Sequence, residues 1–231
     1  RNIYESYKTQ RGPILVDGKA IASSIPSDNA YRYLRVYEND IYSAVTGYFS
    51  VFRGATGMES AANSYLSGQS SSQFFEQVNA VLSGNPVTGA AVELTLDPVL
   101  QQAAWDALGN YRGALIAIDP TTGNILAMVS KPGFDANDVA GHSSKKVTEN
   151  YDALQNDEAN PLINKTIGGD LYHPGPVFKL VLAAAALESG EYTNQSTFDN
   201  PVSVKLPNST SEVFNSSRRA CGSKTEVTLM Y

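Results

Sequence analysis

Residues 171–179 read Leu171-Tyr172-His173-Pro174-Gly175-Pro176-Val177-Phe178-Lys179, and the residues that follow, 180–187, are all apolar. A Pro/Gly turn therefore leads into an apolar run that ends at Glu188-Ser189-Gly190. Because apolar residues cover every face of this run, it predicts a buried helix over 176–189. A proline at the first helical position loses no hydrogen bond, and a glycine suits the C-terminal cap.

Lys179 is the one cation in this apolar segment. Its methylene stem can run along the helix and carry the ammonium group to water. Alternatively, the lysine is held in a site where burial and neighbouring groups tune its pKa for proton transfer. The segment by itself leaves both interpretations open.

The composition excludes several classes of protein. The chain has 231 residues, of which 42% are hydrophobic, and it holds no apolar run of the length that spans a membrane. A net charge of −6 argues against binding to nucleic acid. With one cysteine and two histidines, neither an internal disulfide nor a structural zinc site is expected, and no cofactor is predicted. The opening Arg1-Asn2-Ile3 is not a signal peptide, as expected of a chain whose beginning has been removed.

The first ninety or so residues favour short strands. Residues 7–22 predict two strands around an Asp17-Gly18 turn, and residues 31–37 alternate as a half-buried strand does. Helices are expected to begin near residue 57 and to cover residues 72–82.

Residues 84–90 form the best candidate for a linker, and the character of the chain changes beyond them. Residues 91–96 alternate as a strand, and Asp97-Pro98 supplies an N-cap and a first-turn proline for a helix that ends before Gly109. Two domains are therefore expected, residues 1–90 and residues 91–231.

The strongest local prediction is a hairpin. Residues 113–119 and 124–130 are two β-rich runs joined by turn-forming residues. Residues 141–160 are polar and predict a loop with a single helical turn.

The turn before the apolar helix resembles the penicillin-binding protein signature Tyr-Pro-Pro-Gly-Ser-Thr-Phe-Lys, which contains the Ser-x-x-Lys motif of D,D-transpeptidases. Gly175, Phe178 and Lys179 match the signature. Pro176 stands at the position of the nucleophilic serine, and Val177 replaces the threonine. His173 also replaces a proline of the signature.

Further motifs follow in the family's order. Arg11-Gly12 resembles the start of the pedestal domain, and residues 95–101 resemble the Thr-x-Asp-x-x-Leu-Gln entry to the transpeptidase domain. Residues 113–137 match the family's hairpin almost residue for residue, and residues 160–165 resemble the Pro-Leu-x-Asn-Arg segment. The chain is identified as a member of the class B penicillin-binding proteins, and it is most similar to the actinobacterial penicillin-binding protein A kind.

The resemblance implies an α+β fold. An elongated, mostly β N-terminal pedestal domain of the dimerisation type would be followed by the first part of an α/β transpeptidase domain of the serine β-lactamase-like kind. We expect helix 176–189 to pack against the 113–130 hairpin, since its apolar surface needs a partner. We expect no single sheet to span both segments.

The resemblance also implies a chemistry and a setting. The family cross-links peptidoglycan stem peptides through an acyl-enzyme, in which Lys179 would be the general base and Pro176 occupies the nucleophile position. The implied ligands are stem peptides and β-lactams, and the implied partners are a membrane glycan polymerase and proteins of cell division or cell shape. The implied place is the extracytoplasmic face of the bacterial membrane, anchored by an N-terminal helix that this chain lacks.

Whether this chain is an enzyme is left open by its motifs. Beyond Lys179 it contains neither Ser-x-Asn nor Lys-Thr-Gly, so we expect an inactive front portion of a longer protein. The alternatives are a natural pseudoenzyme that serves as a scaffold for the cell-wall machinery, or an engineered or misread position 176. A non-enzymatic cell-wall adhesin is disfavoured by the hairpin and by the Thr-x-Asp-x-x-Leu-Gln match.

Three segments imitate the missing motifs. Ser143-Ser144-Lys145-Lys146 has the Ser-x-x-Lys spacing but no apolar helix behind it. Ser27-Asp28-Asn29 is expected to be a turn. Ser223-Lys224-Thr225-Glu226 lacks the glycine of Lys-Thr-Gly. None of the three is predicted to be functional.

Overall fold

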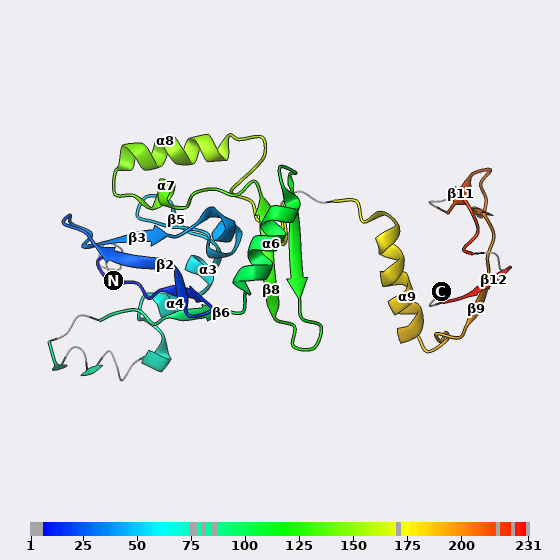
Figure 1. Cartoon of the computed structure of the whole chain (residues 1–231), viewed down its shortest axis with the longest axis horizontal. Helices are drawn as coiled ribbons and strands as arrows, with labels where there is room; N and C mark the ends of the chain where they lie inside the picture. The colour runs from blue at the N-terminus through cyan, green and yellow to red at the C-terminus, as the bar shows by residue number, and fades with distance from the viewer. Residues whose placement is uncertain are drawn as a thin grey trace. The chain divides into compact units, whose positions relative to one another are not determined.

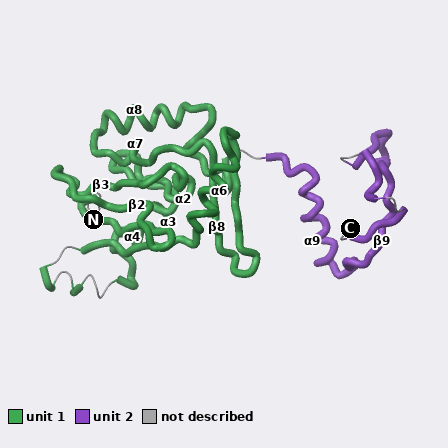
Figure 2. Tube along the Cα trace, in the orientation of Figure 1, with its two compact units in different colours: residues 1–171 green, residues 172–231 purple. Residues whose placement is uncertain are grey.

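The computed structural model describes residues 7–73, 78–79, 82–84, 87–169, 172–215, 218–222 and 225–229. By its internal contacts the chain divides into two compact units, residues 1–171 and residues 172–231 (Figures 1 and 2). The expected domain division near residue 90 is not the division between these units and stays a prediction.

A four-stranded sheet organises the first unit. Its strands are ordered β3-β2-β1-β6 and comprise β1 (Ile14–Val16), β2 (Lys19–Pro26), β3 (Tyr33–Tyr37) and β6 (Val92–Leu94). The predicted hairpin is confirmed, because β1 and β2 pair antiparallel across Asp17 and Gly18, which have φ angles of 50° and 70°.

Strand β6 corrects one expectation. It pairs in parallel with β1, from Ile14 opposite Val92 to Val16 opposite Leu94, so one sheet contains strands from both predicted segments. The expectation of separate sheets is therefore wrong. Without β6, one edge of β1 would present unpaired N–H and C=O groups, and a distant short strand satisfies them.

Short elements connect the sheet to the rest of the first unit. They are η1 (Asp40–Tyr42), α2 (Ser43–Thr46), β4 (Phe49–Ser50), β5 (Gly54–Ala55), α3 (Gly57–Ala61), α4 (Asn63–Leu66) and η2 (Ser71–Gln73). The helix expected from residue 57 is confirmed as α3. Residues 74–77 and 80–81 of the helix predicted over 72–82 lie outside the described residues.

The later part of the first unit contains a helix and a hairpin side by side (Figure 1). Helix α6 (Pro98–Leu108) begins after Asp97 as predicted, and β7 (Gly113–Ile118) pairs antiparallel with β8 (Ile125–Lys131). The predicted hairpin is thus confirmed. Buried Ala104 of α6 packs with Ala127 and Val129 of β8 in a small apolar cluster.

Residues 141–160 differ from the prediction of a loop with one helical turn. After the short α7 (Asn137–Ala140), they contain the twelve-residue α8 (Ser144–Gln155). Val147 is buried, and Tyr151 and Leu154 pack against the main core. Spacings of four and three residues place these side chains on one face, so a narrow apolar stripe suffices to hold a largely polar helix.

The second unit consists of one helix and two small sheets. The turn η3 (Gly175–Phe178) leads into α9 (Lys179–Glu188), which confirms a helix at the predicted place. Strands β9 (Thr197–Asp199) and β12 (Glu226–Thr228) form one antiparallel pair, and β10 (Ser203–Lys205) and β11 (Glu212–Phe214) form another.

The prediction that this helix is buried is wrong in the structure. No residue of α9 is buried, and Leu180 is 71% exposed. Among the described residues of 172–231, the other regular elements are the turn η3 and two two-stranded sheets, which offer too little surface to cover a helix that is apolar on all sides. Packing of α9 on the β7–β8 hairpin stays a prediction, since the two belong to different units.

Candidate active site

The turn that enters α9 is built by glycine and proline. Gly175 has a φ of 53°, a left-handed conformation that glycine adopts without steric cost. Pro176 follows it in the first turn of η3, where its fixed φ and missing N–H are tolerated. The local sequence therefore accounts for the local geometry.

Lys179 lies one turn after Pro176. Its backbone N–H donates to the carbonyl oxygens of Pro176 and Val177, which places positions 176 and 179 on adjacent turns of one helical face. The Lys179 side chain is exposed, and its ammonium group forms no hydrogen bond or ion pair with any residue that the structure describes. Within the second unit alone, this exposure agrees with the interpretation in which the lysine stem carries the ammonium group to water.

Pro176 is compatible with the backbone of the turn, but it lacks the groups that acyl transfer requires at this position. Proline has no side-chain oxygen to attack a carbonyl and no N–H to donate to an oxyanion. The assigned roles of Pro176 and Lys179 stay predictions.

Glycine ends the helix as expected, because Gly190 has a φ of 74° and donates its N–H to the carbonyl oxygen of Leu187.

The Thr-x-Asp-x-x-Leu-Gln motif has structural roles. The Asp97 carboxylate accepts the N–H groups of Val99 and Leu100, at 2.8 and 2.9 Å, and so caps α6. Gln101 is fully buried and its amide donates to the carbonyl oxygens of Ile41 and Met128, at 2.8 and 2.9 Å.

The segment that resembles Pro-Leu-x-Asn-Arg is also held in place by hydrogen bonds. The Asn164 amide donates to the carbonyl oxygen of Ala44 at 2.8 Å, and the Lys165 ammonium donates to the carbonyl oxygen of Asn160 at 2.9 Å. The Ser130 hydroxyl of β8 donates to the carbonyl oxygen of Ile163 at 3.1 Å. The Ser130 bond ties residues 160–165 to the end of β8, the Asn164 bond ties them to α2, and the Lys165 bond lies within the segment.

Sequence reasoning missed a buried ionic cluster of Arg11, Arg35, Tyr37 and Glu59, named here the Glu59 cluster. Glu59 is completely buried, and its carboxylate accepts Nε of Arg11 at 3.0 Å and Nε of Arg35 at 2.6 Å. The Tyr37 hydroxyl donates to the same carboxylate at 3.2 Å. Burial lowers the pKa of Arg11 and, together with the Glu59 charge, raises the pKa of Tyr37 well above its usual value.

One signal in the sequence points to this cluster. The alternation of residues 31–37 places Arg35 and Tyr37 on the same face of β3, and that face is the buried one. An arginine on a buried face needs a partner carboxylate. The sequence does not show which acid this is, because Glu59 lies in a different element.

Two of the three imitating segments have structural roles in place of chemistry. Ser143 is the N-cap residue of α8, and its carbonyl accepts the N–H of Val147 at 2.9 Å, while Lys146 is exposed. In the turn between β2 and β3, the Asn29 side chain accepts the N–H of Tyr31 at 3.0 Å, as predicted. Ser223 and Lys224 lie outside the described residues.

Known proteins match the chain over nearly its whole length. The penicillin binding protein A dimerisation domain matches residues 11–92, and the penicillin binding protein transpeptidase domain matches residues 113–230. The peptidoglycan D,D-transpeptidase PbpA of Mycolicibacterium smegmatis is 36% identical, over 99% of this chain and 48% of its own length. The chain therefore spans about half the length of such curated relatives.

Solved structures agree with the sequence matches. Penicillin-binding protein A from M. tuberculosis, as a ceftriaxone acyl-enzyme complex, matches with a TM-score of 0.86 and 34% identity, covering 98% of this chain and 52% of that chain. PBP2 of Pseudomonas aeruginosa matches with a TM-score of 0.72 and 29% identity, covering 95% of this chain and 48% of that chain. In the part of the chain that the structure describes, no helix has the length and apolarity that crossing a membrane requires. The chain belongs to the class B penicillin-binding proteins, with a dimerisation domain followed by transpeptidase-domain sequence.

Proposed function

We propose that this chain is the pedestal and the front part of the catalytic domain of a peptidoglycan D,D-transpeptidase, and that it does not acylate as written. The observation that carries the second half of this proposal is Pro176, which stands in the first turn before Lys179 at the position of the family's serine. The family assignment supports the first half.

The chemistry explains why one residue has so large an effect. In acyl transfer, a hydroxyl oxygen attacks the carbonyl carbon of the substrate and a base accepts the hydroxyl proton. Lys179 would be this base, and Pro176 offers no oxygen for it to activate. The missing N–H removes an oxyanion donor as well, which alone raises the barrier by about 3 kcal/mol.

The proposed ligands and surroundings of the whole protein follow from its relatives. Penicillin-binding protein A from M. tuberculosis forms acyl-enzymes with ceftriaxone, imipenem and penicillin G. We extend this to stem peptides and β-lactams as ligands of the complete protein, and to a glycan polymerase and division or shape proteins as its partners. The complete protein would be anchored at the extracytoplasmic face of the membrane.

Incubation with a fluorescent penicillin tests the predicted inactivity. We expect no denaturation-resistant adduct on the intact chain, with a mycobacterial penicillin-binding protein A as the positive control. A stoichiometric adduct would contradict the proposal. The Ser143→Ala variant would then show whether the adduct lies on α8.

A scaffold without catalysis is the second candidate function. It is favoured by the same turn, because the proline preserves the backbone shape while eliminating the reaction. Sequencing of the parent gene through codon 176 and past codon 231 separates the two. A serine codon with downstream Ser-x-Asn and Lys-Thr-Gly supports an enzyme, and a proline codon with those motifs decayed supports a scaffold.

A further inference from the structure

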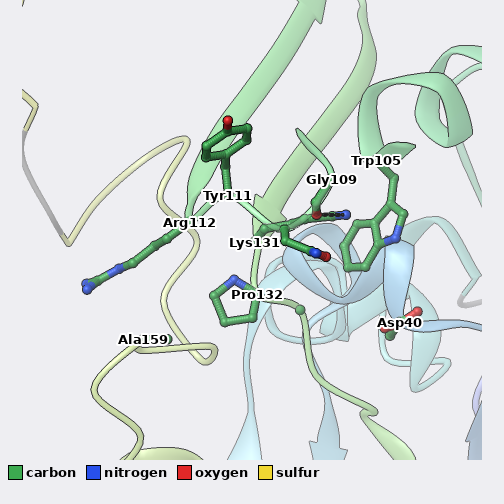
Figure 3. A pocket seen from close by; sticks show the side chains of 10 residues that line it. Asp40, Trp105, Gly109, Tyr111, Arg112, Lys131, Pro132 and Ala159 are labelled. Atoms are coloured by element: carbon green, nitrogen blue, oxygen red, sulfur yellow. Dashed lines mark hydrogen bonds between the residues drawn. The ribbon is translucent and has the colours of Figure 1, made fainter. Parts of the chain in front are cut away.

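His142 is the single histidine of residues 1–171, and it lies between α7 and α8. Histidine is the side chain that ordinarily changes its charge between about pH 5 and pH 8. Several other charged groups of this unit have fixed structural partners. Beside a cavity of about 410 Å³, for example, the Lys131 ammonium donates to the carbonyl oxygen of Gly109 at 2.7 Å and lies 4.3 Å from the centre of the Trp105 ring (Figure 3). A response of this unit to mildly acidic conditions is therefore expected first at His142.

The His142 side chain contacts the turn between β2 and β3. Its Nδ1 atom lies 2.6 Å from the amide nitrogen of Asn29, and the centre of its ring lies 4.8 Å from that of Tyr31. The Tyr31 ring in turn packs edge-on against Phe52 of the turn between β4 and β5, with the two centres 6.4 Å apart. We name the group of Asn29, Tyr31 and His142 the His142 latch.

The His142 latch connects the two segments that match known domains. Asn29 and Tyr31 lie in residues 11–92, which match the dimerisation domain, and His142 lies in residues 113–230, which match the transpeptidase domain. A second contact joins the same two segments, because the Asn137 amide accepts the N–H of Tyr37 and donates to its carbonyl oxygen, both at 2.9 Å. An amide does not titrate, so this second contact should persist at mildly acidic pH.

The orientation of the Asn29 amide determines which form of His142 fits the latch. The Asn29 Oδ1 atom accepts the N–H of Tyr31 at 3.0 Å, which directs its NH2 group toward Nδ1 of His142. An amide NH2 group can only donate, so Nδ1 is the acceptor and the imidazole is neutral, with its proton on Nε2. Protonation of Nδ1 would place one N–H group against another and remove the bond.

The surroundings of His142 also disfavour its charged form. Burial lowers the pKa of His142 below its ordinary value, and a hydrogen bond with the backbone of Tyr33 opposes this in part. His142 lies just before the N-cap residue of α8, where the helix dipole has its positive end. The elements around His142 carry further charged or titratable side chains, none of which is among the causes of this shift: Asp28, Tyr31 and Arg32 of the β2–β3 turn, Arg53 of the β4–β5 turn, Asp138 of α7, and Lys145, Lys146 and Glu149 of α8.

We propose that the His142 latch is a pH-sensitive contact between the dimerisation-domain and transpeptidase-domain sequences of this chain. Neutral His142 accepts the Asn29 amide and holds the β2–β3 turn against the segment before α8. Protonated His142 releases the turn, while Asn137 keeps the end of β3 in place.

The direction of the pH dependence follows from the lowered pKa of His142. A histidine whose pKa is lower in the closed form than in the open form binds fewer protons when the latch is closed, so closure is favoured as the pH rises. The contribution of the latch is complete above the ordinary histidine pKa of about 6.5 and is lost as the pH falls through the lowered pKa.

Nuclear magnetic resonance of the 231-residue chain measures the pKa of His142 directly, and His173→Gln assigns the signals, since these are the two histidines of the chain. In Asn29→Asp, the new carboxylate can still accept the N–H of Tyr31 and can also accept Nδ1–H of a charged His142. We expect this variant to raise the pKa of His142 from below its ordinary value to above it. Ala30→Asp adds the same charge at the next, exposed position without that bond, and it should raise the pKa less.

The contact between the Tyr31 and His142 rings measures closure of the latch. Its nuclear Overhauser signal should weaken at least about fivefold between about pH 7.5 and about pH 5 in the unaltered chain, because the signal follows the closed population. In Asn29→Asp the signal should persist at the lower pH. The signal between the Asn137 amide and Tyr37 should not change in either protein, and it serves as the internal control.

The proposal is overturned if His142 in the unaltered chain titrates at or above the ordinary histidine value. It is also overturned if Asn29→Asp raises the pKa no more than Ala30→Asp does, or if the ring contact persists once His142 is protonated. None of these measurements involves acylation, and the latch does not depend on the proposed transpeptidase function. Failure of either proposal therefore leaves the other standing.

Discussion

The charged side chains of the Glu59 cluster and of the turn before α9 differ in burial and in pairing. In the cluster, one completely buried carboxylate is shared by two buried arginines and a tyrosine hydroxyl. At the turn, Lys179 is exposed and has no partner among the described residues. The first arrangement completes itself within the first unit, whereas the second leaves one exposed ammonium group whose proposed reaction partners are not among the described residues.

This difference distinguishes charged groups that stabilise the fold from a charged group that would take part in a reaction. A buried ion pair whose members contact each other is sensitive to the loss of either member, because the survivor remains buried without compensation. An exposed lysine already has its charge in water, so replacing a neighbouring residue leaves no buried charge without compensation. Mutations should therefore lower stability strongly in the first region and have little effect in the second.

Glu59→Ala is expected to have the largest effect. It leaves Arg11 and Arg35 buried without their carboxylate, which should lower the free energy of unfolding of the first unit by about 3–5 kcal/mol. Urea unfolding monitored by circular dichroism measures the loss. Glu158→Ala removes an exposed carboxylate and serves as the control. Equal stability of the two variants would show that the cluster does not hold this unit together.

Gln101→Ala should follow in size. It leaves the carbonyl oxygens of Ile41 and Met128, and the N–H of Met128, without their buried partner, at a cost of roughly 3 kcal/mol. Gln102→Ala is the matched control, because among the described residues the Gln102 amide bonds to Asp106 alone, at the surface. Equal shifts of the denaturant midpoint in the two variants would contradict this expectation.

Asp97→Ala removes the side-chain cap of α6 and should cost about 1 kcal/mol. Asp106→Ala, near the other end of the same helix, should change the free energy of unfolding by less than about 0.5 kcal/mol. Thermal unfolding resolves a difference of this size. A larger loss of unfolding free energy in Asp106→Ala than in Asp97→Ala would contradict the role of Asp97 as the cap of α6.

Pro176→Ser combined with Val177→Thr should have the smallest effect, which sharpens the contrast between the two regions. The double variant recreates the family's motif one turn before Lys179, yet we expect no acylation by penicillin in the 231-residue chain. The sequence beyond Lys179 contains no Ser-x-Asn and no Lys-Thr-Gly, and groups that act as a unit fail together. The rate of adduct formation is compared with that of the same double variant in the longer parent. Similar rates would show that the chain already holds a complete site.

Local features were predictable because neighbouring residues determine them. Asp17 and Gly18 give a tight turn, Asp97 and Pro98 start a helix, and residues 113–130 form a hairpin. The turn and helix at residues 175–188 also follow from their own sequence. In each of these cases the deciding contacts lie within a few residues along the chain.

Features that depend on distant contacts were mispredicted or missed. Helix α8 is stabilised by buried Val147 and by Tyr151 and Leu154, which pack against a core that the sequence of the helix does not reveal. Strand β6 joins β1 across more than seventy residues, because an open sheet edge accepts any suitable strand. The burial of α9 was predicted from its composition, but burial requires a covering surface as well as an apolar helix.

The sequence by itself determined the family, the order of its motifs and the proline at position 176, since these are properties of residue identity and spacing. Only the tertiary structure decided which acid neutralises Arg11 and Arg35, and that Gln101 is structural. It also brought Trp105, Tyr111, Arg112 and Lys131 around one cavity. The physical reason is that periodicity indicates which side chains face inward, whereas only the packing of distant elements decides which of them meet.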